Sequence, residues 1–255
     1  MWQNKVEGNI KKINVNKNGI VSIITEGTSY KSVIITFDKN GKELFKTYLA
    51  STIAVASDIS VDGKYLAIAE VSIGGAVVES SIKVIEIEKA TQGDTTNSVI
   101  YKYNADSNKI ITDIKYQEKG QLVCMYDNEI HIVDQGTDNK VLEFDQNTQI
   151  ADINLKSYTL RAEEISTGLF SAKTDIILTN ILTNAETTYT IESAIRNVVC
   201  YEEVAAINLG TEVHLINLNG WLEKKYTSTQ ETKDIVLGNS VAGIVYRDRI
   251  KIITF

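Results

Sequence analysis

The sequence predicts an all-β fold, a six-bladed β-propeller of the WD40-like kind with four-stranded antiparallel blades. Two observations carry this prediction. A unit of about 44 residues recurs six times, and each copy contains short apolar strands separated by turns with glycine or asparagine. Helix signals are scarce, because residues 90–98 are polar and turn-like and residues 156–166 alternate as a strand does. A β-sandwich or a different blade number is the alternative.

The first strand of each unit is marked by a polar residue followed by isoleucine or valine. These starts are Lys12-Ile13, Asp58-Ile59, Asp113-Ile114, Asp152-Ile153, Asn197-Val198 and Asp234-Ile235. They lie 46, 55, 39, 45 and 37 residues apart. Such spacing is typical of propeller blades, which contain about 40–50 residues each.

Further strands follow in the same order within each unit. Second strands come after Asn18-Gly19, Asp62-Gly63 and Lys119-Gly120, where glycine supplies the positive φ of a tight hairpin. Third strands recur in six similar copies, at residues 32–36, 81–85, 129–133, 175–179, 212–216 and 249–253. Fourth strands are expected in most units, for example at residues 43–48 and 221–226.

The whole chain, residues 1–255, is expected to form one propeller domain. Its last unit ends at Phe255 after three strands, and residues 2–7 resemble residues 221–226. We therefore predict that the N-terminal segment supplies the missing strand of the final blade, because ring closure minimises exposed sheet edges. Removal of the first eight residues should then lower the melting temperature.

Composition limits the possible partners. Acidic residues outnumber basic residues 33 to 26, so the formal net charge is −7 and the pI is near 5.0. A nucleic-acid partner is not expected, because phosphate binding needs a dense basic surface; a neutral or basic protein or peptide fits better. Cys124 and Cys200 have no metal-site spacing and are interpreted as free thiols. The sequence contains no apolar stretch of about 18 residues, so the chain as given is expected to be soluble.

Residues 58–67, Asp-Ile-Ser-Val-Asp-Gly-Lys-Tyr-Leu-Ala, resemble the S-x-D-G-x-x-L-A phrase of WD40-like and TolB-like propeller repeats. The Gly-His and Trp-Asp dipeptides of true WD40 repeats are absent. The whole pattern is also similar to an uncharacterised family of WD40-like propellers from low-GC Gram-positive bacteria, which commonly carry one N-terminal transmembrane anchor. The resemblance implies an extracytoplasmic domain at the cell envelope, with a cytoplasmic location as the alternative, and it implies no catalytic residues.

Four aspartates form the first candidate site. Because first strands line the central axis of a propeller, we expect the following residues to share one register and to gather at one mouth of the channel: Asp58, Asp113, Asp152 and Asp234. Such a ring could hold Ca²⁺ or the Lys/Arg side chains of a partner. The alternative is that each aspartate accepts backbone N–H groups of the preceding loop.

An insertion in the second unit forms the second candidate site. It runs from Ser72 to Glu79, with Gly74 and Gly75 near its centre, and a second insertion covers residues 89–98. Long loops on a rigid scaffold often carry binding residues, and in propellers this loop opens on the same face as the start of the first strand. A longer hairpin without a ligand is the alternative. The two glycines lack the context of a phosphate loop, so no nucleotide or other cofactor is expected.

The two histidines favour a structural interpretation. His131 and His214 occupy the same position of the third strand, where other units have lysine or isoleucine, so a metal ligand or a general base is disfavoured. The sequence also contains no GxSxG or HExxH motif. We therefore predict a non-enzymatic, monomeric propeller that binds or scaffolds a protein or peptide. A hydrolase or lyase with its site in the central channel is the alternative.

Overall fold

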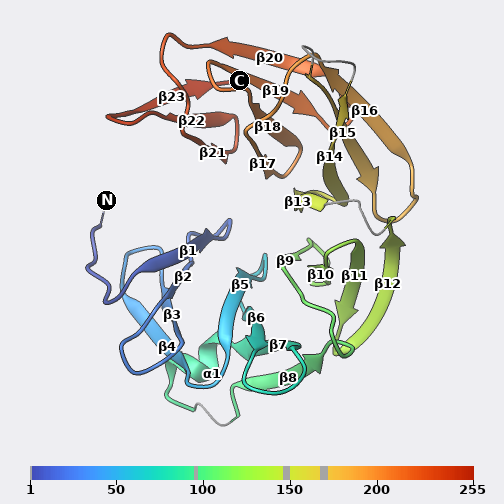
Figure 1. The fold of residues 1–255 in the computed structure, drawn as a ribbon. Coiled ribbons are helices and arrows are strands. Elements are labelled where there is room, and N and C mark those ends of the chain that lie inside the picture. The colour runs from blue at the N-terminus through green and yellow to red at the C-terminus, as the bar shows by residue number, and fades with distance from the viewer. Residues whose placement is uncertain (1, 95–96, 146–149, 167–171) are drawn as a thin grey trace. The chain divides into compact units, whose positions relative to one another are not determined.

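The computed structural model describes residues 2–94, 97–145, 150–166 and 172–255. In these residues 23 strands form six antiparallel sheets, and one short helix is present. Contacts divide the chain into two compact units, Met1–Glu143 and Phe144–Phe255. Each unit contains three sheets, which we number as blades 1 to 6 along the chain (Figure 1).

The first unit contains three four-stranded blades. Blade 1 is β1 (Ile10–Val15), β2 (Val21–Thr25), β3 (Ser32–Phe37) and β4 (Glu43–Leu49). Blade 2 is β5 (Ile53–Ile59), β6 (Tyr65–Ser72), β7 (Glu79–Glu86) and β8 (Val99–Asn104), with helix α1 (Ile87–Thr91) between β7 and β8. Blade 3 is β9 (Asp113–Tyr116), β10 (Leu122–Met125), β11 (Glu129–Asp134) and β12 (Thr137–Glu143).

The second unit contains two four-stranded blades and one three-stranded blade. Blade 4 is β13 (Ile150–Leu155), β14 (Tyr158–Ser166), β15 (Ala172–Asn180) and β16 (Glu186–Ile191). Blade 5 is β17 (Asn197–Tyr201), β18 (Val204–Asn208), β19 (Glu212–Asn217) and β20 (Leu222–Thr227). Blade 6 is β21 (Asp234–Gly238), β22 (Val241–Val245) and β23 (Ile250–Thr254).

The strand order along each blade follows the chain, so sequential strands are hydrogen-bonded neighbours throughout. The second and third strands lie within a few residues of the predicted ranges in every unit where they were named. In blades 1 and 2 these central strands are largely buried. Three first strands differ. β1 and β13 begin two residues before the predicted starts at Lys12 and Asp152. Asp58 was expected to begin the first strand of blade 2, but it lies next to the end of β5. The insertion at residues 89–98 also differs in part, since α1 extends into it.

Neighbouring blades pack face to face within each unit. Ile24 and Ile34 of blade 1 form one apolar cluster with Ile68 of blade 2. On the other face of blade 2, alanines such as Ala67 pack in a second cluster with Leu122 of blade 3. These contacts bury the apolar faces that single sheets would expose to water, which is the dominant favourable contribution to the stability of such layers.

The predicted strand over residues 2–7 is not present in the structure. These residues lie in no strand. The Trp2 ring packs against Phe37 with ring centroids 5.8 Å apart, and the Asn4 side chain donates to the Gly41 carbonyl at 2.6 Å. The N-terminal segment therefore lies against blade 1. Completion of blade 6 by this segment stays a prediction.

Candidate functional site

Asp58, the first of the predicted ring aspartates, connects three blades. Its side chain is 1 % exposed. The carboxylate accepts the backbone N–H of Tyr116 in blade 3 at 2.6 Å and the side-chain amide of Asn14 in blade 1, and Lys115 Nζ lies 3.7 Å away. Burial raises the pKa of Asp58 against the opposing effect of Lys115. Asp58 thus satisfies buried donors of its neighbours.

Asp113 does not share the register of Asp58, contrary to the prediction. Asp113 pairs with Met125 at the end of the ladder far from the hairpin, whereas Asp58 pairs with Ala67 close to the hairpin. Asp113 forms an ion pair with Lys12 of blade 1, with 2.7 Å between Nζ and Oδ1. Two carboxylates that the sequence pattern aligned therefore lie at different levels of the inner strands.

The two predicted aspartates of the second unit also contact the neighbouring blade. Asp152 accepts the backbone N–H of Cys200 in blade 5 at 3.0 Å, and Asp234 accepts the side-chain amide of Asn197 in blade 5 at 3.1 Å. Asp152 accepts backbone N–H groups, as the alternative expected, but from Cys200 of another blade and from Asn154 two residues later, and not from the preceding loop. Cation binding stays a prediction; in the part of the chain described, no three His, Cys, Asp or Glu residues are grouped to hold a metal ion.

The insertion of blade 2 is the loop between β6 and β7. Ser72 and Glu79 pair at its base. At its tip, Ile73 is 58 % exposed and Val77 is 42 % exposed, and space for a side chain at Gly74 is open. The loop therefore presents aliphatic side chains to solvent on a base of paired strands.

A polar cleft of about 410 Å³ lies at the base of this loop. We call it the loop cleft. It is lined by hydroxyl, amide and charged groups at three connections of the first unit, including Ser51, Thr52, Ser72, Glu79, Lys102, Asn104 and Ser107. Residues 51–52 immediately precede β5, so the loop opens on the same side as the start of the first strand, as predicted.

A buried ion pair is hydrogen-bonded to the lining of the loop cleft. Glu70 is 3 % exposed. Its carboxylate lies 2.7 Å from Lys83 Nζ and accepts the hydroxyl of Thr52 at 2.8 Å. The carboxylate is thus neutralised and held by β7 and by the connection into β5, which fixes the geometry of the cleft.

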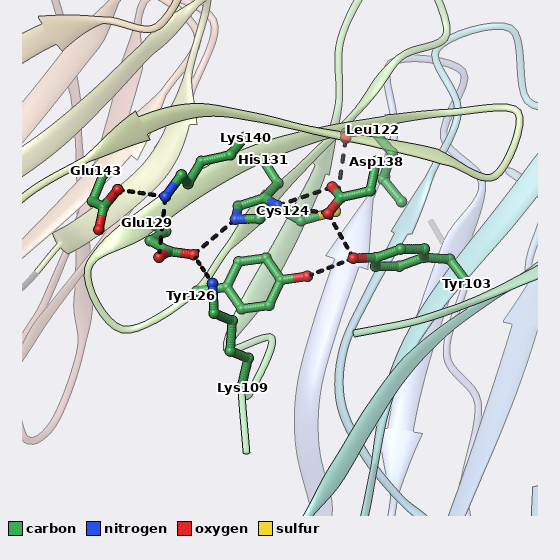
Figure 2. A network of polar contacts seen from close by, with 10 residues as sticks. All are labelled: Tyr103, Lys109, Leu122, Cys124, Tyr126, Glu129, His131, Asp138, Lys140 and Glu143. Atoms are coloured by element: carbon green, nitrogen blue, oxygen red, sulfur yellow. Dashed lines mark hydrogen bonds and ion pairs between the residues drawn. The ribbon is translucent and has the colours of Figure 1, made fainter. Parts of the chain in front are cut away.

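His131 is the centre of a polar network between blades 2 and 3 (Figure 2). Its Nδ1 lies 2.8 Å from Asp138 and its Nε2 lies 2.9 Å from Glu129. From blade 2, the Tyr103 hydroxyl donates to Asp138 at 2.6 Å, and Lys109, from the β8–β9 connection, donates to Glu129 at 2.6 Å. Both ring nitrogens of His131 therefore have partners, which leaves none free to act as a general base.

The charges of this network stabilise the ionised form of Glu129. Burial alone would raise the pKa of this carboxyl, but hydrogen bonds from Lys109 and His131 outweigh burial and lower the pKa to about 2. Burial and the hydrogen bond to Asp138 raise the pKa of Tyr103, so this phenol remains a donor. The network is a set of fixed donors and acceptors that links two blades.

His214 has a similar role in the second unit. Its Nδ1 lies 3.0 Å from the hydroxyl of Tyr189 on the preceding blade, and its Nε2 lies 3.3 Å from Glu212. The structural interpretation of both histidines agrees with these contacts. Cys124 and Cys200 are buried free thiols, and burial raises the pKa of each well above its usual value, so neither is an activated nucleophile.

Several of the residues that connect blades were not predicted. Tyr103 and Tyr189 both lie on fourth strands and reach the next blade, where Tyr103 contacts Asp138 on the fourth strand and Tyr189 contacts His214 on the third strand. On β1 and the turn after it, Asn14 and Asn16 donate to backbone carbonyls of blade 2. Two features of the sequence could have indicated these contacts. Asparagine occurs at every second position around the end of β1, and tyrosine recurs in fourth strands.

The arrangement of strands is that of a known class of fold. Kluyveromyces lactis Hsv2 is 14 % identical, with a TM-score of 0.61 over 96 % of this chain and 74 % of that chain. The β-propeller domain of the Trilobed protease from Pyrococcus furiosus, described as having an open velcro topology, is 10 % identical, with a TM-score of 0.61 over 96 % of this chain and 84 % of that chain. The protein is thus an all-β, six-bladed β-propeller, as predicted.

Within this class, the chain belongs to a family of unknown function, DUF5711, whose model matches residues 1–255. No protein among the curated ones matches it significantly in sequence. A further similar structure is the extracellular domain of a putative one-component system from B. thetaiotaomicron, 12 % identical with a TM-score of 0.55, over 95 % of this chain and 33 % of that chain. In the described residues, no helix has the length and apolar character needed to cross a membrane.

Proposed function

We propose that this protein is a non-enzymatic propeller that binds a protein or peptide through the β6–β7 loop and the loop cleft of blade 2. The observation that carries the proposal is the juxtaposition of two exposed aliphatic side chains, Ile73 and Val77, with a cleft lined mostly by polar and charged groups. Protein interfaces combine apolar contacts with nearby polar groups that form hydrogen bonds. The loop is held on paired strands, which lowers the conformational cost of binding.

The state of the buried polar residues supports binding rather than catalysis. Asp58 is buried and accepts a hydrogen bond from blade 3, Glu129 accepts one from Lys109 of the β8–β9 connection, and buried His131 bonds Asp138 and Glu129 of its own blade. These groups thus stabilise the fold. The serines of the loop cleft have no histidine beside them in the described lining, and a serine nucleophile needs such a base. A hydrolase or lyase is therefore the second candidate.

The proposal includes a location at the cell envelope. The resemblance to anchored propellers of low-GC Gram-positive bacteria supports it, and the one-component system noted above carries a similar propeller in an extracellular domain. The net charge of −7 favours a neutral or basic partner. We propose a monomer whose partner is extracytoplasmic.

The proposal can be tested with a photo-crosslinking amino acid at position 77. It would be introduced into the full chain, expressed in the cells from which the gene comes, and crosslinked products would be identified by mass spectrometry. We expect one protein to be crosslinked at position 77. Position 182 is the matched control, because Leu182 is an apolar residue that is 67 % exposed on a turn of blade 4. The same protein should not be crosslinked there.

Affinity for the identified protein would then be measured by calorimetry. The double variant Ile73→Ser/Val77→Ser should bind at least about tenfold more weakly, since exposed anchors contribute about 1–2 kcal/mol each. Leu182→Ser should bind as the wild type does. Equal affinity of all three proteins, or turnover in a hydrolase and lyase screen that Ile73→Ser/Val77→Ser retains, would contradict the proposal.

A further inference from the structure

The N-terminal segment is fastened across one face of blade 1. We call residues 2–8 the N-terminal strap; it runs beside the β1–β4 sheet (Figure 1). The Trp2 indole N–H donates to the Lys39 carbonyl at 3.1 Å, while its ring packs on Phe37. Val6 packs on the apolar cluster of β2 and β3 that includes Phe37. Both ends of the sheet face are thus in contact with the strap.

Two glycines permit this close approach. Gly41 has φ +81°, and a Cβ built there would lie 2.5 Å from the Trp2 ring. Gly8 has φ +82°, and a Cβ there would lie 1.8 Å from the carbonyl oxygen of Glu26. Both positions need glycine for conformation and for space. The position of the strap on blade 1 therefore depends on one glycine in the β3–β4 turn and one glycine in the strap.

A cavity of about 730 Å³ lies between the strap and blade 1. We call it the strap cavity. Its floor is formed by Val33, Ile35 and Phe37, which project from the same face of β3. Its wall includes Tyr30 and Tyr48, whose rings are 4.7 Å apart and which are 40 % and 52 % exposed. An apolar floor with aromatic walls and this volume are typical of small-molecule sites, which span about 300–1,000 Å³.

The charges around the strap cavity cancel. Lys5 and Glu7 come from the strap, and Lys46 and Glu43 come from β4, where they form an ion pair at 3.1 Å. The hydrogen bond that Lys46 donates to Glu43 raises the pKa of Lys46, so this lysine stays charged. A lining with two cations and two anions favours neither an anionic nor a cationic ligand. An apolar floor beside two paired phenol rings, tilted by 42° to each other, favours a flat, uncharged ring.

We infer that the strap cavity is a binding site for an uncharged, largely apolar molecule with an aromatic ring system. The ring system lies on the floor of Val33 and Ile35 and stacks against Tyr48. This site is separate from the loop cleft of blade 2, since no residue lines both. Ligand binding and strap position are coupled, because the strap forms one wall.

Trp2 makes the inference testable, because it is one of only two tryptophans. The other, Trp221, is 70 % exposed, so Trp221→Phe in the full chain leaves Trp2 as the sole reporter. Nile red is an uncharged, flat aromatic probe. We expect saturable one-to-one binding with a change in Trp2 emission.

Two variants in the same Trp221→Phe background test the cavity walls. Tyr48→Ala should weaken Nile red binding at least fivefold. Ser29→Phe should weaken it at least tenfold, because Ser29 is exposed and lines the cavity.

Two controls make the result decisive. Leu182→Ala removes an exposed apolar side chain far from the strap in sequence and should leave Nile red affinity unchanged. Anilinonaphthalene sulfonate, which carries one negative charge, should bind at least tenfold more weakly than Nile red. Non-saturable binding, unchanged affinity in both Tyr48→Ala and Ser29→Phe, or saturation without a change in Trp2 emission would overturn the inference.

Discussion

The polar clusters around His131 and His214 occupy equivalent positions of blades 3 and 5. They differ in the number of charged groups around the imidazole ring. In each, glutamate is the first residue of the third strand, histidine is the third residue, and lysine faces the histidine on the fourth strand. A tyrosine comes from the preceding blade. The members are Glu129, His131, Lys140 and Tyr103 for blade 3, and Glu212, His214, Lys225 and Tyr189 for blade 5. Asp138 and Lys109 are additional residues around the cluster of blade 3.

Asp138 changes how neighbouring blades are linked. In blade 3, Tyr103 donates to the Asp138 carboxylate, which in turn contacts His131. In blade 5, the tyrosine hydroxyl contacts His214 directly. Hydrogen bonds to charged groups contribute about 1.5–3 kcal/mol, against about 0.5–1.5 kcal/mol between neutral groups. The same repeat position therefore contributes unequal stability, and its surroundings decide how much.

The largest expected effect is that of His131→Ala compared with His214→Ala. Removal of His131 takes one hydrogen bond away from each of two carboxylates, Glu129 and Asp138, which keep Lys109 and Tyr103 as donors. Because both lost hydrogen bonds are to charged groups, we expect a loss of about 3 kcal/mol in the free energy of unfolding. Removal of His214 should cost about 1 kcal/mol, because Glu212 keeps its ion pair with Lys225 at 2.7 Å. Urea denaturation of both variants measures the difference. Equal losses would show that Asp138 adds nothing to the cluster of blade 3.

The second prediction concerns acid pH. The pKa of Glu129 is lowered to about 2 in the folded protein, so its contribution is complete above the unfolded value and is lost as the pH falls from about 5 to 2. The contribution at neutral pH is at most about 3 kcal/mol. In Glu129→Gln, the acid loss of stability should be smaller by that amount.

Glu212→Gln is the matched control for the acid prediction. The hydrogen bond from Lys225 lowers the pKa of Glu212 as well, but this carboxyl is more exposed, so solvent weakens its interactions. The slope of stability against pH below 5 should therefore change little in Glu212→Gln. A larger change in Glu212→Gln than in Glu129→Gln would contradict the comparison.

The parts of the fold that the sequence predicted are those with a strong local signal. The third strands, including 129–133 and 212–216, were placed within a few residues, since their apolar pattern is set by burial within the blade. The starting residues of the first strands were predicted less accurately. Asp58 and Asp113 look alike in sequence, yet β5 begins five residues before Asp58 and β9 begins at Asp113. Register depends on cross-strand pairing, which one strand's sequence does not specify.

The candidate site was predicted in part for a similar reason. The β6–β7 loop was found because its length stands out within the repeat, and the role of both histidines followed from their shared position. The contacts of Tyr103 and Asp138 were missed, because they join residues 35 positions apart on different blades. The N-terminal strap was also missed: its seat depends on Gly41 in the β3–β4 turn, and only the folded sheet brings the two segments together.

The smallest expected effects are those of the two tyrosines, which isolate the link between blades. Tyr103→Phe removes a donor to a carboxylate and should cost about 1.5 kcal/mol, whereas Tyr189→Phe should cost about 1 kcal/mol. Double-mutant cycles separate this contact from the rest of each cluster: Tyr103→Phe with Asp138→Asn, and Tyr189→Phe with His214→Ala. The coupling energy should be larger in the first cycle, because only there does the tyrosine hydroxyl bond a charged group that also holds the histidine. Equal coupling would mean that the charge of Asp138 adds nothing to the link between blades 2 and 3.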